Sequence, residues 1–272
     1  MTSHRPRKRF GQNFLESQGV IDRIVGAIAP ARDDRIVEIG PGLGALTGPL
    51  MQRVDRLDVV ELDRDLAVTL AERLGHPDGL TIHSADALAF DFSRLAVDGP
   101  IRVVGNLPYN ISTPLLFHLL DQADAIHDMH FMLQKEVVDR ICAAPGGKTW
   151  GRLGVMTQLR ADVARLFTVP PGAFRPPPKV DSAIVRIVPR SLTVEERSQL
   201  PAMGLLVRAA FAQRRKTLRN TLKRYIDERD IEAVGIDPQR RAETLDLGEL
   251  KRLAEAIPAE KKEAADRQPP RQ

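Results

Sequence analysis

Short apolar runs alternate with helical patterns through the first half of this 272-residue chain. The runs typical of strands cover residues 35–39, 57–62, 80–83, 101–105 and 129–133. The helical patterns between them cover residues 46–54, 65–74, 114–120 and 135–142. Because a helix between two strands allows the chain to return in the same direction, such strands become parallel neighbours in one sheet. The alternation therefore predicts an α/β domain with a mostly parallel central sheet.

The pattern changes after Gly151. Residues 163–169 and 182–188 are typical of an antiparallel strand pair, separated by the proline-rich segment 170–178, and from about Leu192 the sequence is helical without further strands. We therefore expect an α/β domain over residues 1–190 and a small C-terminal helical domain over residues 191–257. The charged, proline-containing tail 258–272 is expected to be disordered.

Composition limits the class of protein. Hydrophobic residues make up 43% of the chain and charged residues 28%, as in soluble globular proteins. No apolar run approaches the length of a membrane span. The basic N-terminus is not followed by the apolar segment of a signal peptide, so we expect none. The single cysteine, Cys142, fits a reducing compartment. We expect a cytoplasmic protein without a membrane partner.

Basic residues gather in two clusters although the net charge is only +4. The first cluster comprises Arg5, Arg7, Lys8 and Arg9. The second lies in residues 198–226, which contain no acidic residue; its members are Arg208, Arg214, Arg215, Lys216, Arg219, Lys223 and Arg224. A solvated helix face is the usual explanation of a charge run, but on such faces basic side chains usually alternate with acidic ones four residues away. The absence of acidic residues here weakens that explanation. The clusters favour a polyanion partner contacted at more than one place.

Functional side chains follow four successive predicted strands. The first strand ends in a glycine-rich turn over residues 38–44, where a ligand can approach the backbone closely. Glu61 ends the second strand about twenty residues later, a spacing that suits a ribose diol. Asp86 follows the third strand and could accept a hydrogen bond from an adenine amino group, and Asn106 follows the fourth. This succession predicts an adenosyl ligand.

The turn favours S-adenosylmethionine over a dinucleotide. Its glycines are Gly40, Gly42 and Gly44, which depart from the spacing of a pyrophosphate-binding turn. Glu38 would also repel a pyrophosphate, whereas it would tolerate the ammonium and sulfonium of S-adenosylmethionine. A salt bridge between Glu38 and an arginine is the alternative use of this carboxylate, and the sequence leaves it open.

Residues 106–109 (Asn106, Leu107, Pro108 and Tyr109) supply an amide oxygen, a backbone carbonyl outside a regular ladder, and an aromatic face. Together these groups suit the exocyclic amine of a planar base that stacks on the ring. Alone, the four residues are more typical of an ordinary strand-to-loop turn. The neighbouring adenosyl-binding pattern favours the base-binding interpretation.

The chain resembles the bacterial small-subunit ribosomal RNA adenine-N6,N6-dimethyltransferase family over nearly all of its length. The segments that carry the resemblance are 9–15, 38–44, 61–63, 86–87, 106–110, 131–136, 151–155 and 174–182. The resemblance implies a Rossmann-like S-adenosylmethionine-dependent methyltransferase domain. It implies that the methyl donor is bound by Asn13, Leu15, Gly40, Glu61, Asp86 and Asn106. It also implies that the N-terminal segment 1–15 covers this site and that the C-terminal helices grip RNA.

The resemblance also suggests a mechanism. Hydrogen bonds from adenine N6 to the Asn106 side-chain oxygen and the Leu107 carbonyl would draw the nitrogen toward a nucleophilic form, while Tyr109 stacks on the base. Phe174 is a candidate for the opposite face of the base or, equally, for core packing. No metal or general base is needed, and His83, His118, His127 and His130 lack ligand spacing. The expected RNA contacts are Arg7, Lys8, Arg9, Arg214, Arg215, Lys216, Arg219 and Lys223.

The expected substrate is two adjacent adenosines in the 3′-terminal hairpin of small-subunit (16S) ribosomal RNA, within a small-subunit precursor, and the enzyme is expected to act as a monomer. A large-subunit methyltransferase of the antibiotic-resistance type is the nearest alternative. A ribosome-assembly binding factor is another. A DNA adenine methyltransferase and an NAD-dependent oxidoreductase fit less well. Trp150 departs from the smaller aromatic residue expected in its loop.

Overall fold

The computed structural model describes residues 13–258 and 260–261, which divide into two units. The first unit contains the chain up to Val138 together with Ala161–Arg190, and the second contains Asp139–Arg160 and the chain from Ser191 onward. The expected boundary near Arg190 coincides with a change of unit. The assignment of residues 139–160 to the first domain was wrong, because side chains of this segment belong to the hydrophobic core of the second unit.

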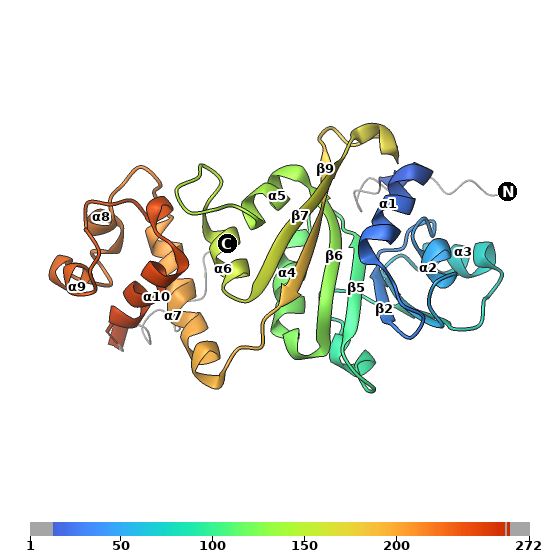
Figure 1. Ribbon diagram of the computed structural model, residues 1–272, viewed down its shortest axis with the longest axis horizontal. Coiled ribbons are helices and arrows are strands. Elements are labelled where there is room, and N and C mark those ends of the chain that lie inside the picture. Colours follow the sequence, from blue (N-terminus) through green and yellow to red (C-terminus); the bar gives the residue numbers. More distant parts are fainter. Residues whose placement is uncertain (1–12, 259, 262–272) are drawn as a thin grey trace. The chain divides into compact units, whose positions relative to one another are not determined.

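A seven-stranded sheet forms the centre of the first unit (Figure 1). Its members are β2 (Arg35–Ile39), β3 (Arg56–Glu61), β4 (Leu80–Ser84), β5 (Ile101–Asn106), β6 (Ile126–Gln134), β7 (Ala161–Val169) and β9 (Ser182–Pro189), in the order β4-β3-β2-β5-β6-β9-β7. The first five pair in parallel, and β9 pairs antiparallel with both β6 and β7. The five predicted parallel strands and the predicted antiparallel pair are confirmed.

The helices expected between the strands also form. They are α2 (Thr47–Met51), α3 (Arg64–Leu74), α4 (Ser112–Asp121) and α5 (Lys135–Ile141), and the single-turn segments η2 (Phe92–Leu95) and η3 (Ala123–Ala125) lie beside them in the chain. Helix α1 (Gln18–Ile28) was not predicted. Its buried residues Ile21, Ile24, Val25 and Ile28 recur at the spacing of one helix face, so its amphipathic pattern was present in the sequence.

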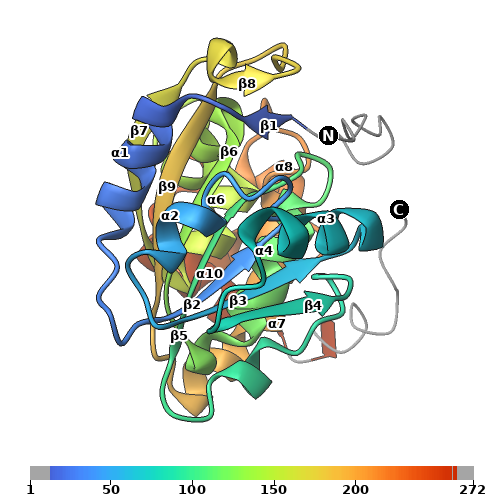
Figure 2. The same ribbon diagram turned by 90° about the vertical axis from the view of Figure 1, so that its right-hand side faces the viewer.

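A second, two-stranded sheet joins distant parts of the first unit. Strand β1 (Phe14–Leu15) pairs antiparallel with β8 (Phe174–Arg175), as Figure 2 shows, and η4 (Pro171–Ala173) directly precedes β8. The backbone N–H groups of Glu16 and Ser17 both donate to the carbonyl oxygen of Ala173, at 2.9 and 3.2 Å. The start of the described chain is therefore fixed to the proline-rich loop that leads into β9.

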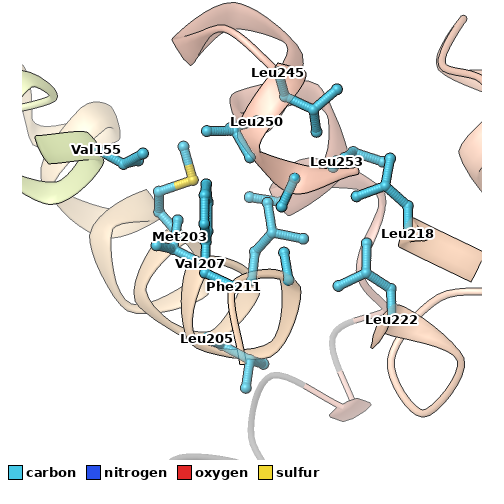
Figure 3. Close-up of a cluster of buried hydrophobic side chains, with 14 of the residues drawn as sticks. Val155, Met203, Leu205, Val207, Phe211, Leu218, Leu222, Leu245, Leu250 and Leu253 are labelled. Atoms are coloured by element: carbon cyan, nitrogen blue, oxygen red, sulfur yellow. The ribbon is translucent and has the colours of Figure 1, made fainter. Parts of the chain in front are cut away.

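The second unit contains helices and loops but no strand among its described residues. It contains α6 (Arg152–Gln158), α7 (Val194–Ala210), α8 (Leu218–Leu222), α9 (Glu228–Ala233), η5 (Ala242–Thr244) and α10 (Leu247–Ala256). Capping boxes begin the two longest helices, Thr193 with Glu196 at α7 and Asp246 with Glu249 at α10. Both helices contribute apolar side chains to one core, including Met203, Val207, Leu250 and Leu253 (Figure 3).

Trp150 belongs to this second core. Its side chain is fully buried and its indole N–H donates to the carbonyl oxygen of Leu245 at 3.0 Å. A Cβ added at Gly154 would lie 3.4 Å from the indole ring and 2.5 Å from the carbonyl oxygen of Arg140. The large ring therefore packs against a glycine of α6, and its polar group is satisfied by the backbone.

Among the residues that the structure describes, none of the helices is both long enough and apolar enough to cross a membrane. The expected basic N-terminal cover, with Arg7, Lys8 and Arg9, begins outside the described residues. Most of the expected disordered tail lies outside them as well.

Candidate active site

The site lies where the strand order of the main sheet reverses. Strands β2 and β5 are neighbours at this point, and the chain leaves them toward opposite edges of the sheet. Ligands of open α/β sheets bind in the crevice at the carboxyl ends of such strands. A cavity of about 560 Å³ occupies this position. It is lined by all six residues expected at the methyl donor, namely Asn13, Leu15, Gly40, Glu61, Asp86 and Asn106.

The glycine-rich turn after β2 requires its glycines. Gly40, Gly42 and Gly44 have φ angles of +65°, +56° and +85°, in the left-handed region that side chains disfavour. A Cβ at Gly42 would lie 3.2 Å from the ring of Phe14, and one at Gly44 would lie 2.7 Å from Leu70. The turn is therefore packed beneath β1 and against α3, and it leaves its backbone open to the cavity.

Glu61 ends β3 with its carboxylate almost fully buried, at 7% exposure. The backbone N–H of Asp63 donates to Oε1 at 2.8 Å. Burial raises the pKa of Glu61, and the surrounding backbone N–H groups, first that of Asp63, oppose the shift. The carboxylate is thus held at the cavity wall before any ligand binds.

Asp86 is exposed at the rim of the same cavity, after β4. Its Oδ1 accepts a hydrogen bond from the backbone N–H of Leu88 at 2.9 Å, which fixes the side chain in a turn.

Glu38 does not make the salt bridge that the sequence left open. It is 2% exposed, lines the cavity, and accepts a 2.6 Å hydrogen bond from the hydroxyl of Thr47, while no basic side chain among the described residues pairs with it. Burial raises the pKa of Glu38 to about 7; the hydrogen bond from Thr47 opposes the shift and Glu61 adds to it. Sequence reasoning missed Thr47, although a hydroxyl at the start of the helix after the turn was a usable signal.

Asn106 has its amide orientation set by the beginning of the described chain. Its Nδ2 donates to the carbonyl oxygen of Asn13 at 3.2 Å, so Oδ1 is the remaining polar atom of the side chain. Within residues 13–258, no group donates to Asn106 Oδ1 or to the carbonyl oxygen of Leu107, whose own N–H donates to Met132 O at 3.2 Å. Both Asn106 and Leu107 line the cavity, so two acceptors that receive no hydrogen bond from the described part of the chain occur at consecutive residues.

Tyr109 lines the cavity next to these acceptors. Its hydroxyl forms a 3.0 Å hydrogen bond with the hydroxyl of Ser182, the first residue of β9. The carbonyl oxygen of Tyr109 accepts a hydrogen bond from Ser112 Oγ at 3.1 Å. The sequence predicted the ring but not the serine that holds it.

Phe174 does not line the cavity in this structure. Its side chain is 5% exposed and packs in a hydrophobic cluster with Leu15, Val169 and Ala173. The pairing of β8 with β1 turns the side chain of Phe174 into this core. Of the two uses that the sequence allowed for Phe174, core packing is the one present in this structure.

The basic residues expected to contact RNA in the second unit fall into two groups. Arg214 pairs with Glu243 at 2.9 Å and Arg219 pairs with Glu228 at 3.6 Å. Arg215, Lys216 and Lys223 are exposed and form no ion pair with the described residues. The acidic partners come from beyond residue 226, so the acid-free stretch in the sequence did not reveal them.

Comparison with known proteins identifies the family. Residues 3–258 match the model of the family described as ribosomal RNA adenine dimethylase. The chain belongs to this family. A dimethylase-family relative from Cupriavidus pinatubonensis, named ribosomal RNA small subunit methyltransferase A, is 57% identical over 93% of this chain and 94% of its own length. A protein of the same name from Pseudomonas fluorescens is 54% identical over 97% and 98%.

Two solved structures of similar proteins agree with this assignment. A dimethyladenosine transferase from Plasmodium falciparum is 25% identical, with a TM-score of 0.75 over 90% of this chain and 98% of its own. The 23S rRNA methyltransferase ErmE is 29% identical, with a TM-score of 0.70 over 90% and 99%. The Rossmann-like methyltransferase fold expected for a member of the dimethylase family is confirmed.

Proposed function

We propose that this chain transfers methyl groups from S-adenosylmethionine to N6 of two adjacent adenosines in the 3′-terminal hairpin of small-subunit ribosomal RNA. The proposed substrate is a precursor of the small ribosomal subunit, and the enzyme acts as a cytoplasmic monomer. One observation carries the proposal: Asn106 and Leu107, whose side-chain Oδ1 and backbone carbonyl accept no hydrogen bond from any residue that the structure describes, line one cavity with Glu61 and Asp86. The names of the relatives at 54–57% identity support the choice of ribosomal subunit.

The residues of the cavity fit an adenosyl ligand. Glu61 binds the two hydroxyl groups of the ribose, and Asp86, at the rim, accepts from the adenine amino group. Glu38 is buried at the cavity wall, and the ammonium group of S-adenosylmethionine would offset the free-energy cost of burying its carboxylate. S-adenosylmethionine supplies an activated methyl group on its sulfonium when it is bound.

The acceptors at Asn106 and Leu107 act on the substrate nitrogen. The lone pair of adenine N6 is delocalised into the ring, which makes the nitrogen a poor nucleophile. Two N–H donors bound by Asn106 Oδ1 and the Leu107 carbonyl direct the lone pair away from the ring and toward the donor methyl. Tyr109 stacks on the base, an interaction worth about 1–3 kcal/mol. As N6 takes the methyl group, the sulfonium would leave as a neutral thioether and the alkylated nitrogen, now acidic, would release one proton to solvent. Alignment for this in-line transfer supplies much of the rate.

The proposal is tested with unmethylated small ribosomal subunits and methyl-labelled S-adenosylmethionine. We expect dimethyladenosine on the small-subunit RNA and none on large-subunit RNA or duplex DNA. The likeness to ErmE makes large-subunit RNA the second candidate, and label on that RNA alone would favour it. Absence of transfer to any RNA over a range of salt concentrations would contradict the proposal. A variant that binds immature subunits but transfers no methyl group would separate an assembly role from catalysis.

The affinity for S-adenosylmethionine is expected to depend on pH through Glu38. Its pKa of about 7 means that the carboxyl binds a proton below neutrality, whereas an ammonium ligand requires the carboxylate. The dissociation constant should therefore fall about 10-fold between pH 6 and pH 8 as this proton is lost. Titration calorimetry in two buffers of different ionisation enthalpy measures both the affinity and the proton released. Glu38→Gln should abolish the proton release, and an unchanged release in this variant would contradict the assignment.

The two groups of basic residues are expected to differ in RNA binding. Arg215→Ala, Lys216→Ala and Lys223→Ala should each lower the slope of log affinity against log salt by about 0.7–0.9. Arg214→Ala should change the slope less, because Glu243 already neutralises Arg214. Binding of unmethylated subunits between low and physiological salt provides the measurement. An equal effect of all four substitutions would show that the ion pair is broken on binding.

A further inference from the structure

The phenol group of Tyr109 is held by a side chain from a distant strand. Tyr109 lies in the loop after β5, whereas Ser182 begins β9, 73 positions later in the chain. Their hydroxyl oxygens are 3.0 Å apart, within hydrogen-bonding distance. Ser182 is 1% exposed and is absent from the cavity wall, so its hydroxyl reaches the site only through Tyr109.

Ser182 is a rigid anchor because its backbone is paired on both sides. It lies opposite Gln134 of β6 and opposite Val169 of β7. The preceding carbonyl, that of Asp181, accepts a hydrogen bond from the N–H of Lys135 at 2.9 Å. A hydroxyl attached to an interior strand with this many backbone partners moves little.

The other end of Tyr109 is fixed as well. Ser112 Oγ donates to its carbonyl oxygen at 3.1 Å, and the N–H of Ile111 donates to the carbonyl oxygen of Pro108 at 3.2 Å. With the backbone and the hydroxyl both held, the side-chain torsions of Tyr109 are restricted. Because a phenol hydroxyl prefers to bond in the plane of its ring, rotation of the ring is also restricted. The aromatic face is thereby oriented before a base arrives.

We propose that Ser182 is a positioning residue, which holds the ring of Tyr109 in the orientation that stacks on the target adenine. This inference rests on the proposed function, since it assigns Ser182 a part in capturing the same base. Preorientation matters here because a flipped base gains stacking energy only from a ring that is already parallel to it. Ser182 therefore acts on the bound RNA and leaves the binding of S-adenosylmethionine unaffected.

The test is a double-substitution cycle with Ser182→Ala, Tyr109→Phe and the double variant, assayed on unmethylated small subunits. Each single substitution should lower kcat about 3- to 10-fold, the size expected for the loss of one hydrogen bond. The KM for subunits should stay within about twofold, because phosphate contacts provide most of the affinity for RNA. The double variant should be no slower than the slower single variant, because both substitutions remove the same interaction.

Thr157→Val is the matched control. The Thr157 hydroxyl is also fully buried, but it lies in α6 and has no hydrogen-bond partner among residues 13–258 and 260–261. Its removal should leave kcat unchanged, whereas a loss of rate would point to a general effect of removing buried hydroxyls. The dissociation constant for S-adenosylmethionine should match that of the wild type in all four variants.

Three results would overturn the inference. Full activity of Ser182→Ala would show that the hydrogen bond is dispensable, and additive losses in the double variant would show that Ser182 acts on the structure by another route. If Ser182→Ala does not fold, Tyr109→Phe, which keeps both the ring and the serine, carries the test alone, and its full activity would be decisive. Failure of the proposed function is distinguishable, because the wild-type protein would then transfer no methyl group.

Discussion

Asn106→Asp should lower kcat for methyl transfer at least about 100-fold, the effect of losing one key hydrogen bond in a transition state. An aspartate can accept a hydrogen bond from adenine N6, so the loss does not follow from the target base alone. The loss follows from Asn13, because its carbonyl oxygen accepts a hydrogen bond from Asn106 Nδ2 at 3.2 Å in the wild-type protein. A carboxylate at this position brings two oxygens together without a proton, and the side chain must rotate or become protonated. Single-turnover transfer from labelled S-adenosylmethionine to unmethylated subunits measures the loss.

Two further substitutions isolate the cause. Asn106→Ala should be about as slow as Asn106→Asp, because both lack an acceptor in the required place. Asn110→Asp adds the same charge to the exposed part of the loop and should cost only a few-fold. If Asn106→Asp kept wild-type activity, the bond to Asn13 would have no part in orienting the amide.

Glu61→Ala should weaken S-adenosylmethionine binding at least about 100-fold, because hydrogen bonds to a charged group contribute about 1.5–3 kcal/mol each and a ribose diol offers two donors. The buried carboxylate is already held by the N–H of Asp63, so it binds the diol without reorganisation. Calorimetric titration of the purified protein measures the dissociation constant. The free energy of unfolding should be measured in parallel, because the substitution leaves a buried N–H of Asp63 without its acceptor.

Asp86→Ala is the comparison for Glu61. One of its oxygens accepts from the N–H of Leu88 and the side chain is exposed, so a single hydrogen bond to the ligand is at stake. We expect a loss of about 10-fold or less, in line with one solvent-exposed interaction. A larger loss for Asp86→Ala than for Glu61→Ala would reverse the roles assigned to the two carboxylates.

The sequence predicted those parts of the fold that depend on local patterns. Apolar runs and helical spacing located the central strands and the helices between them, and strand ends brought Gly40, Glu61, Asp86 and Asn106 to one edge of the sheet. The pairing of β1 with β8 was not predictable in this way, because each strand has two residues and their partners lie far apart in the chain. Without that pairing, the sequence could not decide between core packing and base stacking for Phe174.

Contacts between distant side chains were also beyond local patterns. Nothing in the sequence around Thr47 or Ser182 indicates a functional role. Their roles become visible only from their hydrogen bonds, Thr47 with Glu38 and Ser182 with Tyr109. The segment 139–160 was misplaced for a similar reason. Trp150 looks like any buried aromatic residue until the carbonyl of Leu245, 95 positions later, is found to accept its N–H.

In the proposed mechanism, the two acceptors at Asn106 and Leu107 also determine what happens between successive transfers. Unmodified adenine presents two N6 protons, one for each acceptor. After the first transfer the nitrogen carries a single proton, so one acceptor is left unengaged while the second methyl group is added. After the second transfer no N6 proton remains, so the dimethylamino group donates no hydrogen bond to either oxygen. A buried acceptor without a donor is unfavourable, so the binding of the base weakens in two steps and the finished product is the form that the site retains least.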